Sequence, residues 1–383
     1  MATDDPRERA EQRTLLMPRR DHGSELPRGT QLQEFVVERV LGVGGYSIVY
    51  LARDTRLDRR VALKEYLPAT LAMRAPDGTV VPRLPRFQEF YDKGLASFLN
   101  EARLLGAFDH PALLKVFRFW QERGTAYMVM PYYEGVTLKR WLADLGAPPS
   151  ERWLRQLAEP LARALAVLHA ERCYHRDVAP DNILLLYDRG AGPSYLEQAP
   201  HPLLLDFGAA RRVIGDATQN LTAILKSGYS PVEQYEGETS SRQGPWTDVY
   251  ALAAVLYTAV TGRSPGSSVS RVVRDELVPA VVAGKGRYSE NFLAAIDAGL
   301  AVRPERRPQS MQALVELFDR PAAPAVAPAA APATAPAGKP HAALANGGAD
   351  AADAGQSWRR LAVALATAVG LSVLAALAWW LLR

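Results

Sequence analysis

The chain has 383 residues, of which 48% are hydrophobic and 22% charged, and this is typical of a folded protein long enough for more than one domain. Its formal net charge of +4 and the lack of a basic stripe with interleaved aromatic residues argue against a nucleic-acid-binding protein. The single cysteine, Cys173, excludes an intrachain disulfide and favours a reducing compartment.

The first part of the chain has the pattern of short strands. Residues 1–30 are rich in charge and lack an apolar signal segment, so we predict a disordered arm there. From residue 31 to 133, one segment with helical spacing, Ala96–Phe108, interrupts a series of β-branched and aromatic runs. These runs predict strands over Glu34–Leu41, Ser47–Asp54, Arg60–Tyr66, Leu113–Gln121 and Thr125–Tyr133.

Helical periodicity dominates residues 134–318. The clearest predicted helices are Leu138–Leu145, Glu151–Glu171, Thr247–Gly262 and Glu290–Leu300. A β-rich part over residues 31–133 followed by an α-rich part over residues 134–318 predicts an α+β fold with two lobes.

The end of the chain differs in composition. Residues 319–357 form a Pro/Ala-rich tract that predicts a semi-extended linker. Within residues 358–383, the uncharged run 361–382 is long enough to span a hydrocarbon layer of roughly 30 Å as a helix, and the linker before it disfavours a buried helix of the globular domain. Because Arg359 and Arg360 precede the run and Arg383 follows it, the positive-inside rule predicts that residues 1–360 lie in the cytoplasm. The run has alanine-rich faces that can pair two helices in a membrane, but it has no G-x-x-x-G motif. A homodimer through this helix is therefore one open alternative.

Gly42 and Gly44 lie between two predicted strands. Glycines there let the backbone approach phosphates closely, although the same pair can simply form a hairpin turn. Ser47 stands where a third glycine would complete G-x-G-x-x-G, and the strand that follows argues against a dinucleotide-binding unit.

Lys64 lies on an apolar strand and, if it points inward, needs an anionic partner, for which Glu101 is the candidate. The alternative is an exposed strand lysine.

The stretch YHRDVAPDNIL, residues 174–184, combines several polar side chains next to an apolar run. Asp177 and Asn182 precede one short strand, and Asp206 ends another. Carboxylate and amide oxygens at adjacent strand ends can bind Mg²⁺ and orient a hydroxyl for attack. The order of a glycine loop, a V-A-x-K strand, H-R-D-x-x-x-x-N and D-F-G is a specific set.

In these motifs, residues 31–318 resemble the protein kinase family, in particular the bacterial Ser/Thr kinases of eukaryotic type. The resemblance implies a bilobal kinase fold, transfer of the ATP γ-phosphoryl group with Mg²⁺ to Ser/Thr hydroxyls of protein substrates, and autophosphorylation. With the predicted membrane helix, it implies a single-pass protein of the bacterial inner membrane. The residues that it assigns to ATP binding are Gly42, Val43, Gly44, Val49, Ala62, Lys64, Met130, Pro131, Tyr133 and Leu184.

The resemblance also implies individual roles. Asp177 is the expected catalytic base, Lys64 and Glu101 the expected ion pair, and Asn182 and Asp206 the expected Mg²⁺ ligands. The residues expected to form an apolar spine are His175, Phe207, Leu105 and Val116. The residues expected to have structural roles are Glu233 and Arg307, as an ion pair, and Asp248, which braces the catalytic loop.

Two positions depart from the family pattern. Ala179 stands where the family usually has a lysine near the transferring phosphate, and Lys226 stands seven residues before Glu233, where a threonine is usual. Our hypothesis is that Lys226 supplies the cation that Ala179 cannot; the alternative is a solvated loop lysine. Residues 66–94 resemble an insertion before the helix that carries Glu101, and it either regulates that helix or is a passive loop.

Arg176 precedes the catalytic aspartate and is expected to bind a phosphate on the activation segment, or else to pair with an acidic neighbour. The candidate acceptors are Thr222 as the first choice, then Thr218, Ser227 and Ser230.

Two functions stay open: an active, membrane-tethered kinase, and a pseudokinase that binds ATP and acts as a signalling scaffold. The complete set of motif residues favours the first. Phosphotransfer to a small molecule is disfavoured by the stretch 228–235, which resembles a peptide-docking segment.

Overall fold

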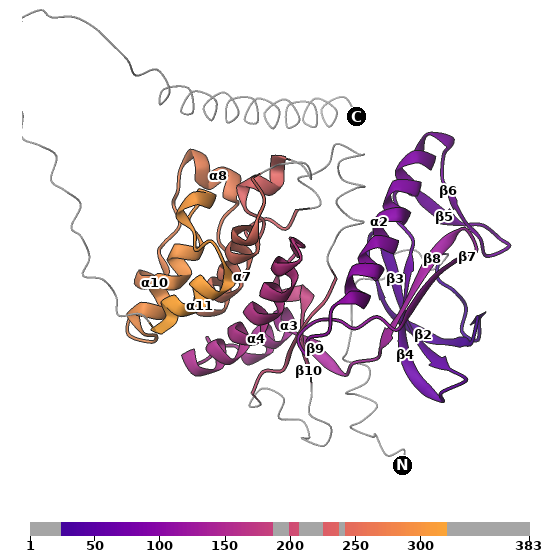
Figure 1. Cartoon of the computed structure of the whole chain (residues 1–383), viewed down its shortest axis with the longest axis horizontal. Helices are drawn as coiled ribbons and strands as arrows, with labels where there is room; N and C mark the ends of the chain where they lie inside the picture. The colour runs from indigo at the N-terminus through magenta and orange to yellow at the C-terminus, as the bar shows by residue number, and fades with distance from the viewer. Residues whose placement is uncertain (1–23, 187–198, 207–224, 237–241, 320–383) are drawn as a thin grey trace, which may run out of the picture. The chain divides into compact units, whose positions relative to one another are not determined.

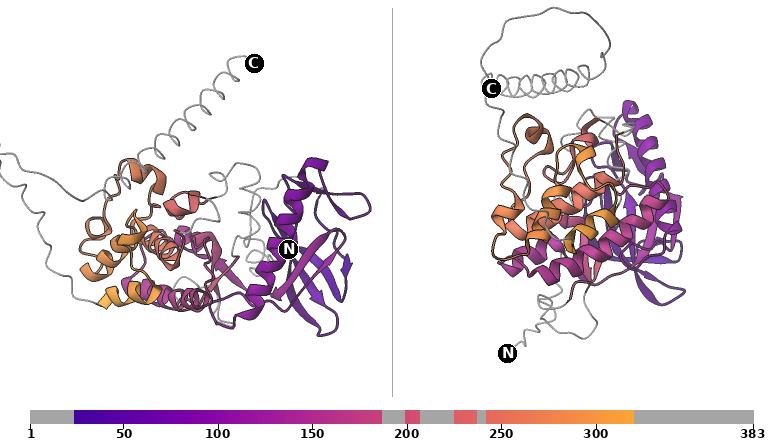
Figure 2. Two further views of the ribbon diagram at one scale, coloured as in Figure 1. Left: turned by 45° about the horizontal axis from the view of Figure 1, so that its top comes forward. Right: turned by 60° about the vertical axis from the view of Figure 1, so that its left-hand side comes forward.

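The computed structural model describes residues 24–186, 199–206, 225–236 and 242–319 (Figure 1). Nearly all of them belong to one compact unit, which consists of a β-rich lobe and a helical lobe (Figure 2). Val269–Glu276, which includes most of α8 (Ser268–Val273), belongs to a second unit and holds an internal ion pair between Arg271 and Asp275.

The β-rich lobe is built on a six-stranded antiparallel sheet with the order β1-β2-β3-β4-β8-β7. Its strands are β1 (Gln31–Leu32), β2 (Phe35–Val43), β3 (Ser47–Asp54), β4 (Arg59–Tyr66), β7 (Arg118–Glu122) and β8 (Thr125–Pro131). Every residue of β4 from Val61 to Tyr66 is buried, which requires cover on both faces of the strand. The predicted strands are confirmed except over Leu113–Gln121, where the strand begins only at Arg118.

Helix α2 (Gln88–Ala107) packs against β7 and β8, and it begins earlier than the predicted Ala96. Its first turns extend the helix because Tyr91 is buried and packs in a tilted arrangement against Tyr66, with ring centroids 5.3 Å apart. The bounds of the predicted insertion over residues 66–94 need a correction, because Tyr66 ends β4 and residues 88–94 begin α2. The segment between them forms a hairpin of β5 (Ala72–Arg74) and β6 (Val80–Pro82), followed by the short helix η1 (Pro85–Phe87). That this segment is inserted relative to the kinase family pattern stays a prediction.

The predicted disordered arm over residues 1–30 also needs a correction. Leu26 is 4% exposed and belongs to the hydrophobic core of the β-rich lobe. Its backbone N–H donates to the Tyr50 hydroxyl at 3.1 Å. Residues 24–30 are thus part of this lobe. Burial of the apolar Leu26 side chain is favourable in free energy, whereas burial of the charged side chains earlier in the chain would not be. Residues 1–23 lie outside the described part of the chain.

The helical lobe is centred on α7 (Pro245–Thr261), which packs against α4 (Glu151–Ala170), α10 (Glu290–Gly299) and α11 (Met311–Asp319). Pro245 at its first position and Gly262 in the left-handed conformation after its end are typical helix boundaries. The lobe also contains α3 (Leu138–Leu145) and α9 (Ala280–Ala283). All predicted helices of this lobe are confirmed, with ends that differ by one or two residues.

A small antiparallel sheet with the order β11-β10-β9 lies at the end of the helical lobe beside the large sheet (Figures 1 and 2). Its strands are β9 (Gly135–Thr137), β10 (Ile183–Leu186) and β11 (Pro202–Leu204). Gly135 is required here, since a Cβ at this position would lie 2.4 Å from the Leu185 carbonyl oxygen. This sheet sets the position of the polar residues that flank β10 and β11.

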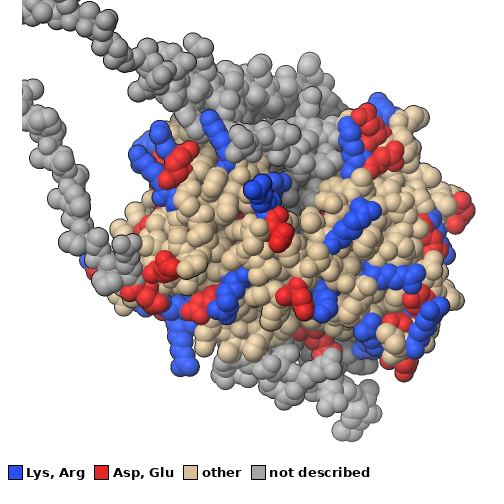
Figure 3. All heavy atoms as spheres, in the orientation of Figure 1, with Lys and Arg blue, Asp and Glu red and all other residues tan. Residues whose placement is uncertain are grey.

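Basic and acidic side chains alternate over the face shown in Figure 3. Ion pairs at the surface, such as Arg140 with Asp144 at 2.8 Å, contribute little to stability because water screens them.

The predicted linker and the predicted membrane helix, residues 319–357 and 358–383, lie outside the described residues from residue 320 onward. In the part of the chain that the structure does describe, none of the helices has the length and apolar character needed to cross a bilayer.

Candidate active site

Lys64 is the buried cation that links the two lobes. Its Nζ lies 3.2 Å from Glu101 Oε1 on α2 and 2.6 Å from Asp206 Oδ1, just after β11. The predicted pair of Lys64 with Glu101 is confirmed, and the contact with Asp206 is an addition to it. Burial disfavours the charge, but the carboxylates of Asp206 and Glu101 outweigh burial and raise the pKa of the Lys64 ammonium. Lys64 is therefore a fixed positive charge at the junction of the lobes.

The two expected Mg²⁺ ligands lie at adjacent strand ends. The backbone N–H of Leu205 donates to the Asn182 carbonyl oxygen at 2.8 Å, so Asp206 follows directly after the residue bonded to Asn182. The Asn182 side-chain nitrogen donates to Asp177 Oδ2 at 2.7 Å, which leaves its amide oxygen as the metal-binding atom. One carboxylate and one amide oxygen suit Mg²⁺, which takes its remaining ligands from phosphates and water.

Asp248 braces the loop that carries Asp177, as predicted. This aspartate of α7 is fully buried, and it accepts hydrogen bonds from the backbone N–H groups of His175 at 2.8 Å and Arg176 at 2.7 Å. Arg176 has a φ of +62°, a left-handed conformation that costs energy for a side chain of this size. The two bonds to Asp248 stabilise that conformation and thereby aim the next residue, Asp177.

Lys226 lies beside Asp177, as the hypothesis that Lys226 supplies the cation missing at Ala179 requires. Lys226 Nζ lies 3.3 Å from Asp177 Oδ1 and 2.9 Å from Asp181 Oδ1. Burial disfavours ionisation of Asp181, but the ammonium group of Lys226 holds the pKa of this carboxyl below its ordinary value. Lys226 is therefore not a solvated loop lysine in this structure.

The residues assigned to ATP binding gather around the sheet and β10. Val49 pairs with both Gly42 and Lys64 across neighbouring strands, and Ala62 pairs with Met130. Ala62 and Met130 belong to the hydrophobic core, and Val49, Tyr133 and Leu184 pack against that core. The remaining three residues are the exposed Val43 and Gly44 at the end of β2, and the half-buried Pro131 at the end of β8. Their role in binding a nucleotide stays a prediction.

The expected apolar spine is placed in part. His175 is 1% exposed and its Nε2 lies 2.8 Å from the Leu205 carbonyl oxygen. Leu105 on α2 is buried in the core, and Val116 packs against it. Phe207 lies outside the described residues, as do the two phosphate acceptor candidates Thr218 and Thr222.

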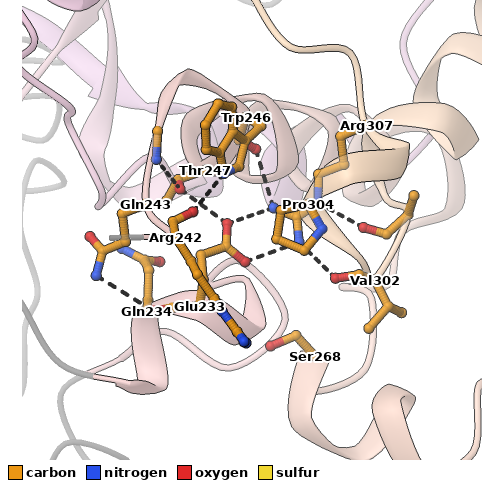
Figure 4. Close-up of polar contacts among 12 residues, drawn as sticks. Glu233, Gln234, Arg242, Gln243, Trp246, Thr247, Ser268, Val302, Pro304 and Arg307 are labelled. Atoms are coloured by element: carbon orange, nitrogen blue, oxygen red, sulfur yellow. Dashed lines mark hydrogen bonds and ion pairs between the residues drawn. The ribbon is translucent and has the colours of Figure 1, made fainter. Parts of the chain in front are cut away.

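The predicted pair of Glu233 and Arg307 is confirmed and is bidentate, with N–O distances of 2.7 and 3.1 Å (Figure 4). Both side chains are almost fully buried. The Thr247 hydroxyl also donates to Glu233, and the arginine donates further bonds to the carbonyl oxygens of Ala301, Trp246 and Val302. This pair fixes the end of the segment that carries Lys226.

Arg176 has the surroundings expected of a phosphate-binding arginine only in part. Its Nε is buried and has no hydrogen-bond partner among the described residues. Of the two described acceptor candidates, Ser227 is exposed, whereas Ser230 is 4% exposed and would have to leave its site to be modified.

Comparison with known proteins agrees with this geometry. A model of the protein kinase domain matches residues 35–318. The chain belongs to the protein kinase family. Serine/threonine-protein kinase PknB of Mycobacterium tuberculosis is 31% identical over 284 residues, which cover 71% of this chain and 40% of PknB. Serine/threonine-protein kinase PrkC of Bacillus subtilis is 29% identical over 240 residues, which cover 62% of this chain and 32% of PrkC. The chain thus spans less than half the length of these curated relatives.

A solved structure described as the apo form of PpkA-294 is similar to this kinase domain with a TM-score of 0.70 and 41% sequence identity. It covers 78% of this chain and 100% of the PpkA-294 chain. The kinase domain of Mycobacterium tuberculosis PknI, at 22% identity and a TM-score of 0.54, shows the shared fold.

One polar cluster of this kinase domain was missed in the sequence. Glu65, the neighbour of Lys64 on β4, is fully buried and accepts hydrogen bonds from the hydroxyls of Tyr50 and Tyr127, both at 2.8 Å. Arg74 of the β5–β6 hairpin pairs with it at 2.5 Å. A glutamate inside an apolar strand, with tyrosines on both neighbouring strands, is the signal that could have revealed it. Asp181, the second partner of Lys226, was likewise not expected.

Proposed function

We propose that this chain is an ATP-dependent protein serine/threonine kinase that also phosphorylates itself. The observation that carries the proposal is the link from the buried Glu101 through the buried Lys64 to the partly exposed Asp206, which joins the two lobes through three charged groups. Removing such charges from water is costly and is offset here by their pairing. Charged groups held in this way concentrate at functional sites. The names of the relatives support serine and threonine as the acceptors.

The chain's own residues account for the proton and the nucleotide. As the substrate oxygen forms a bond to the γ-phosphorus and the bond from that phosphorus to the β–γ bridging oxygen breaks, the Asp177 carboxylate accepts the hydroxyl proton and ADP leaves. Lys64 contributes its charge to the ATP phosphates, and Asn182 and Asp206 would hold Mg²⁺. When bound, Mg²⁺ neutralises part of the phosphate charge.

The test uses the full-length chain in detergent with radiolabelled ATP and Mg²⁺, alongside Asp177→Asn. We expect label on the chain or on a generic substrate protein, and a loss of at least about 100-fold in the variant. Labelled serine or threonine after acid hydrolysis supports the acceptor class. Failure of the wild-type chain to transfer phosphate while it still binds ATP would refute the proposal.

A specific observation favours a second candidate, an ATP-binding pseudokinase that acts as a scaffold. Ala179 is fully buried in the catalytic loop, so the loop itself has no cation where other members of the family have one. The same assay separates the two functions, because a pseudokinase binds nucleotide and incorporates no label.

We further infer that the chain is tethered to the inner membrane of a bacterium by a helix within residues 358–383, with its kinase domain in the cytoplasm. The uncharged run 361–382 and the arginines before it support this. Membrane fractionation of the full chain and of a variant with two arginines in the run, Leu371→Arg/Leu374→Arg, tests the proposal. The wild-type chain should sediment with membranes and the variant should be released from them.

A further inference from the structure

The segment that begins at Lys226 places a positive charge beside the catalytic carboxylate. The Lys226 ammonium lies within 3.3 Å of Asp177 Oδ1 and 2.9 Å of Asp181 Oδ1. Its side chain is only 17% exposed, so its charge is screened less than that of a surface lysine. Since Asp177 receives the hydroxyl proton in the proposed reaction, this ammonium would lie next to the oxygen that attacks the phosphoryl group.

The catalytic loop does not provide such a charge at Ala179. The side chain of Ala179 is a buried methyl group, and the residue has extended backbone dihedral angles just before the short helix η2 (Pro180–Asn182). The two neighbouring carboxylates, Asp177 and Asp181, come from the same loop. Lys226, which comes from another segment, is the ammonium group that pairs with both of these carboxylates.

The turn from Lys226 to Ser230 is compact. The backbone N–H groups of Tyr229 and Ser230 both donate to the Lys226 carbonyl oxygen, at 2.9 and 3.0 Å. Gly228 has a φ of +88°, and a Cβ at this position would lie 2.3 Å from the Pro265 carbonyl oxygen. Only glycine permits this approach, so the backbone of the turn lies directly against the residues that follow α7.

Side chains hold the same turn to the helical lobe. The Tyr229 hydroxyl lies 3.1 Å from Thr258 Oγ1 on α7. The Ser268 hydroxyl donates to the Ser230 carbonyl oxygen at 2.8 Å. The position of Lys226 is thus set by contacts with the core of the helical lobe, independently of Asp177 and Asp181.

We propose that Lys226 is a catalytic residue that stabilises the negative charge on the phosphoryl group during transfer, and that the turn over residues 226–230 delivers it. The inference rests on the proposed kinase activity and deepens it. It follows that in this chain the cation depends on the docking of the activation segment, whereas a lysine at position 179 would be present whenever the catalytic loop is folded.

The experiment compares steady-state phosphorylation of a generic substrate by the full-length wild-type chain, Lys226→Met, Lys226→Thr, Lys226→Arg and the exchange variant Lys226→Thr/Ala179→Lys. We expect Lys226→Met and Lys226→Thr to lower kcat by about 100-fold or more, with the KM for ATP changed less than about threefold. Lys226→Arg, which retains the charge, should keep at least about ten times the kcat of Lys226→Met. The exchange variant should recover at least about tenfold over Lys226→Thr.

The matched control is Lys139→Met. Lys139 is exposed on α3 and also acts on Asp181 through its charge, and its removal should leave kcat within about twofold. The inference is overturned if Lys226→Met keeps more than half of the wild-type kcat, or if its loss appears only in the KM for ATP or in the melting temperature. Folded exchange and arginine variants that both stay as slow as Lys226→Met would also overturn it. Lack of transfer by the wild-type chain would instead count against the proposed kinase activity.

Discussion

Among the described residues, each lobe of the kinase domain has a buried pair of an arginine and a glutamate, and the two pairs are built differently. In the β-rich lobe, the carboxylate has three side-chain donors, because Glu65 accepts bonds from Arg74, Tyr50 and Tyr127. Arg74 also donates to the carbonyl oxygens of Ser24 and Gly78. In the helical lobe, the arginine is the shared partner, because Arg307 donates to Glu233 and to three carbonyl oxygens.

This difference decides what is lost when an arginine is removed. Without Arg74, the carbonyl oxygens of Ser24 and Gly78 would lose the bonds from its guanidinium, but Glu65 would still have two hydroxyl donors. Without Arg307, Glu233 would keep the Thr247 hydroxyl alone as a described side-chain donor, and the carbonyl oxygens of Ala301, Trp246 and Val302 would lose the bonds from this guanidinium. A buried charge without its partner costs more than the pair contributes. The helical lobe should therefore be the more sensitive of the two.

The largest effect is expected for Arg307→Met. Loss of this guanidinium from a fully buried site should lower the free energy of unfolding by about 3–5 kcal/mol. Urea unfolding followed by circular dichroism measures it. Arg306→Met is the matched control, since Arg306 is an exposed neighbour and its change should stay within about 0.5 kcal/mol. Similar values for both variants would contradict the role of the buried pair.

A smaller effect is expected for Arg74→Met, about 2–3 kcal/mol in the same measurement, because the two tyrosine hydroxyls still compensate Glu65. The exposed Arg56 provides the control variant, Arg56→Met. A loss as large as that of Arg307→Met would show that the hydroxyls do not share the charge of Glu65.

A third buried carboxylate, Asp248, extends the comparison to pH. Burial disfavours its ionised form, but the hydrogen bond and charge of His169, the charge of His175 and the bond from the Arg176 N–H outweigh burial and lower the pKa of Asp248. Because the pKa is lower in the folded state, ionised Asp248 adds stability above its unfolded pKa of about 3.9, and this stability is lost as pH falls through the folded pKa. Urea midpoints measured from pH 7 to pH 2.5 should fall less steeply at the acid end for Asp248→Asn than for the wild-type chain. Urea midpoints that fall with the same slope at low pH in the wild-type chain and in Asp248→Asn would refute this expectation.

The smallest effect is expected for Tyr127→Phe, which removes one of the three donors to Glu65 and should cost about 1 kcal/mol of unfolding free energy. A double-mutant cycle with Arg74→Met sharpens the comparison, since the two changes share one carboxylate and should cost more together than the sum of their separate costs. Simple additivity would mean that Glu65 is compensated by other groups.

Several parts of this architecture could be predicted from the sequence. The helices of the helical lobe were confirmed because their apolar spacing and their caps agree, as Pro245 and Gly262 show for α7. The pairs of Lys64 with Glu101 and of Glu233 with Arg307 were predicted from the family pattern. The roles of the residues assigned to ATP, to Mg²⁺ and to phosphate binding stay predictions.

Other parts could not be predicted, since they depend on contacts between distant or irregular segments. The start of α2 at Gln88 depends on the burial of Tyr91 against Tyr66, and the burial of Leu26 depends on a strand more than twenty residues away. The hairpin of β5 and β6 has weak strand signals, and only its partner Glu65 shows why Arg74 is needed.

By itself, the sequence determined the order of the motifs, the division into a β-rich and a helical lobe, and the residue types available for chemistry, because periodicity and spacing are local properties of the chain. The tertiary structure alone decided the charge contacts that no motif indicates, such as those of Lys226 with Asp181 and of Arg74 with Glu65. Lys226 faces Asp177 because Gly228, Tyr229 and Ser230 fix its turn to the helical lobe. Burying a charge is costly unless an opposite charge lies within a few ångströms, and such a distance is set only when the whole domain has packed.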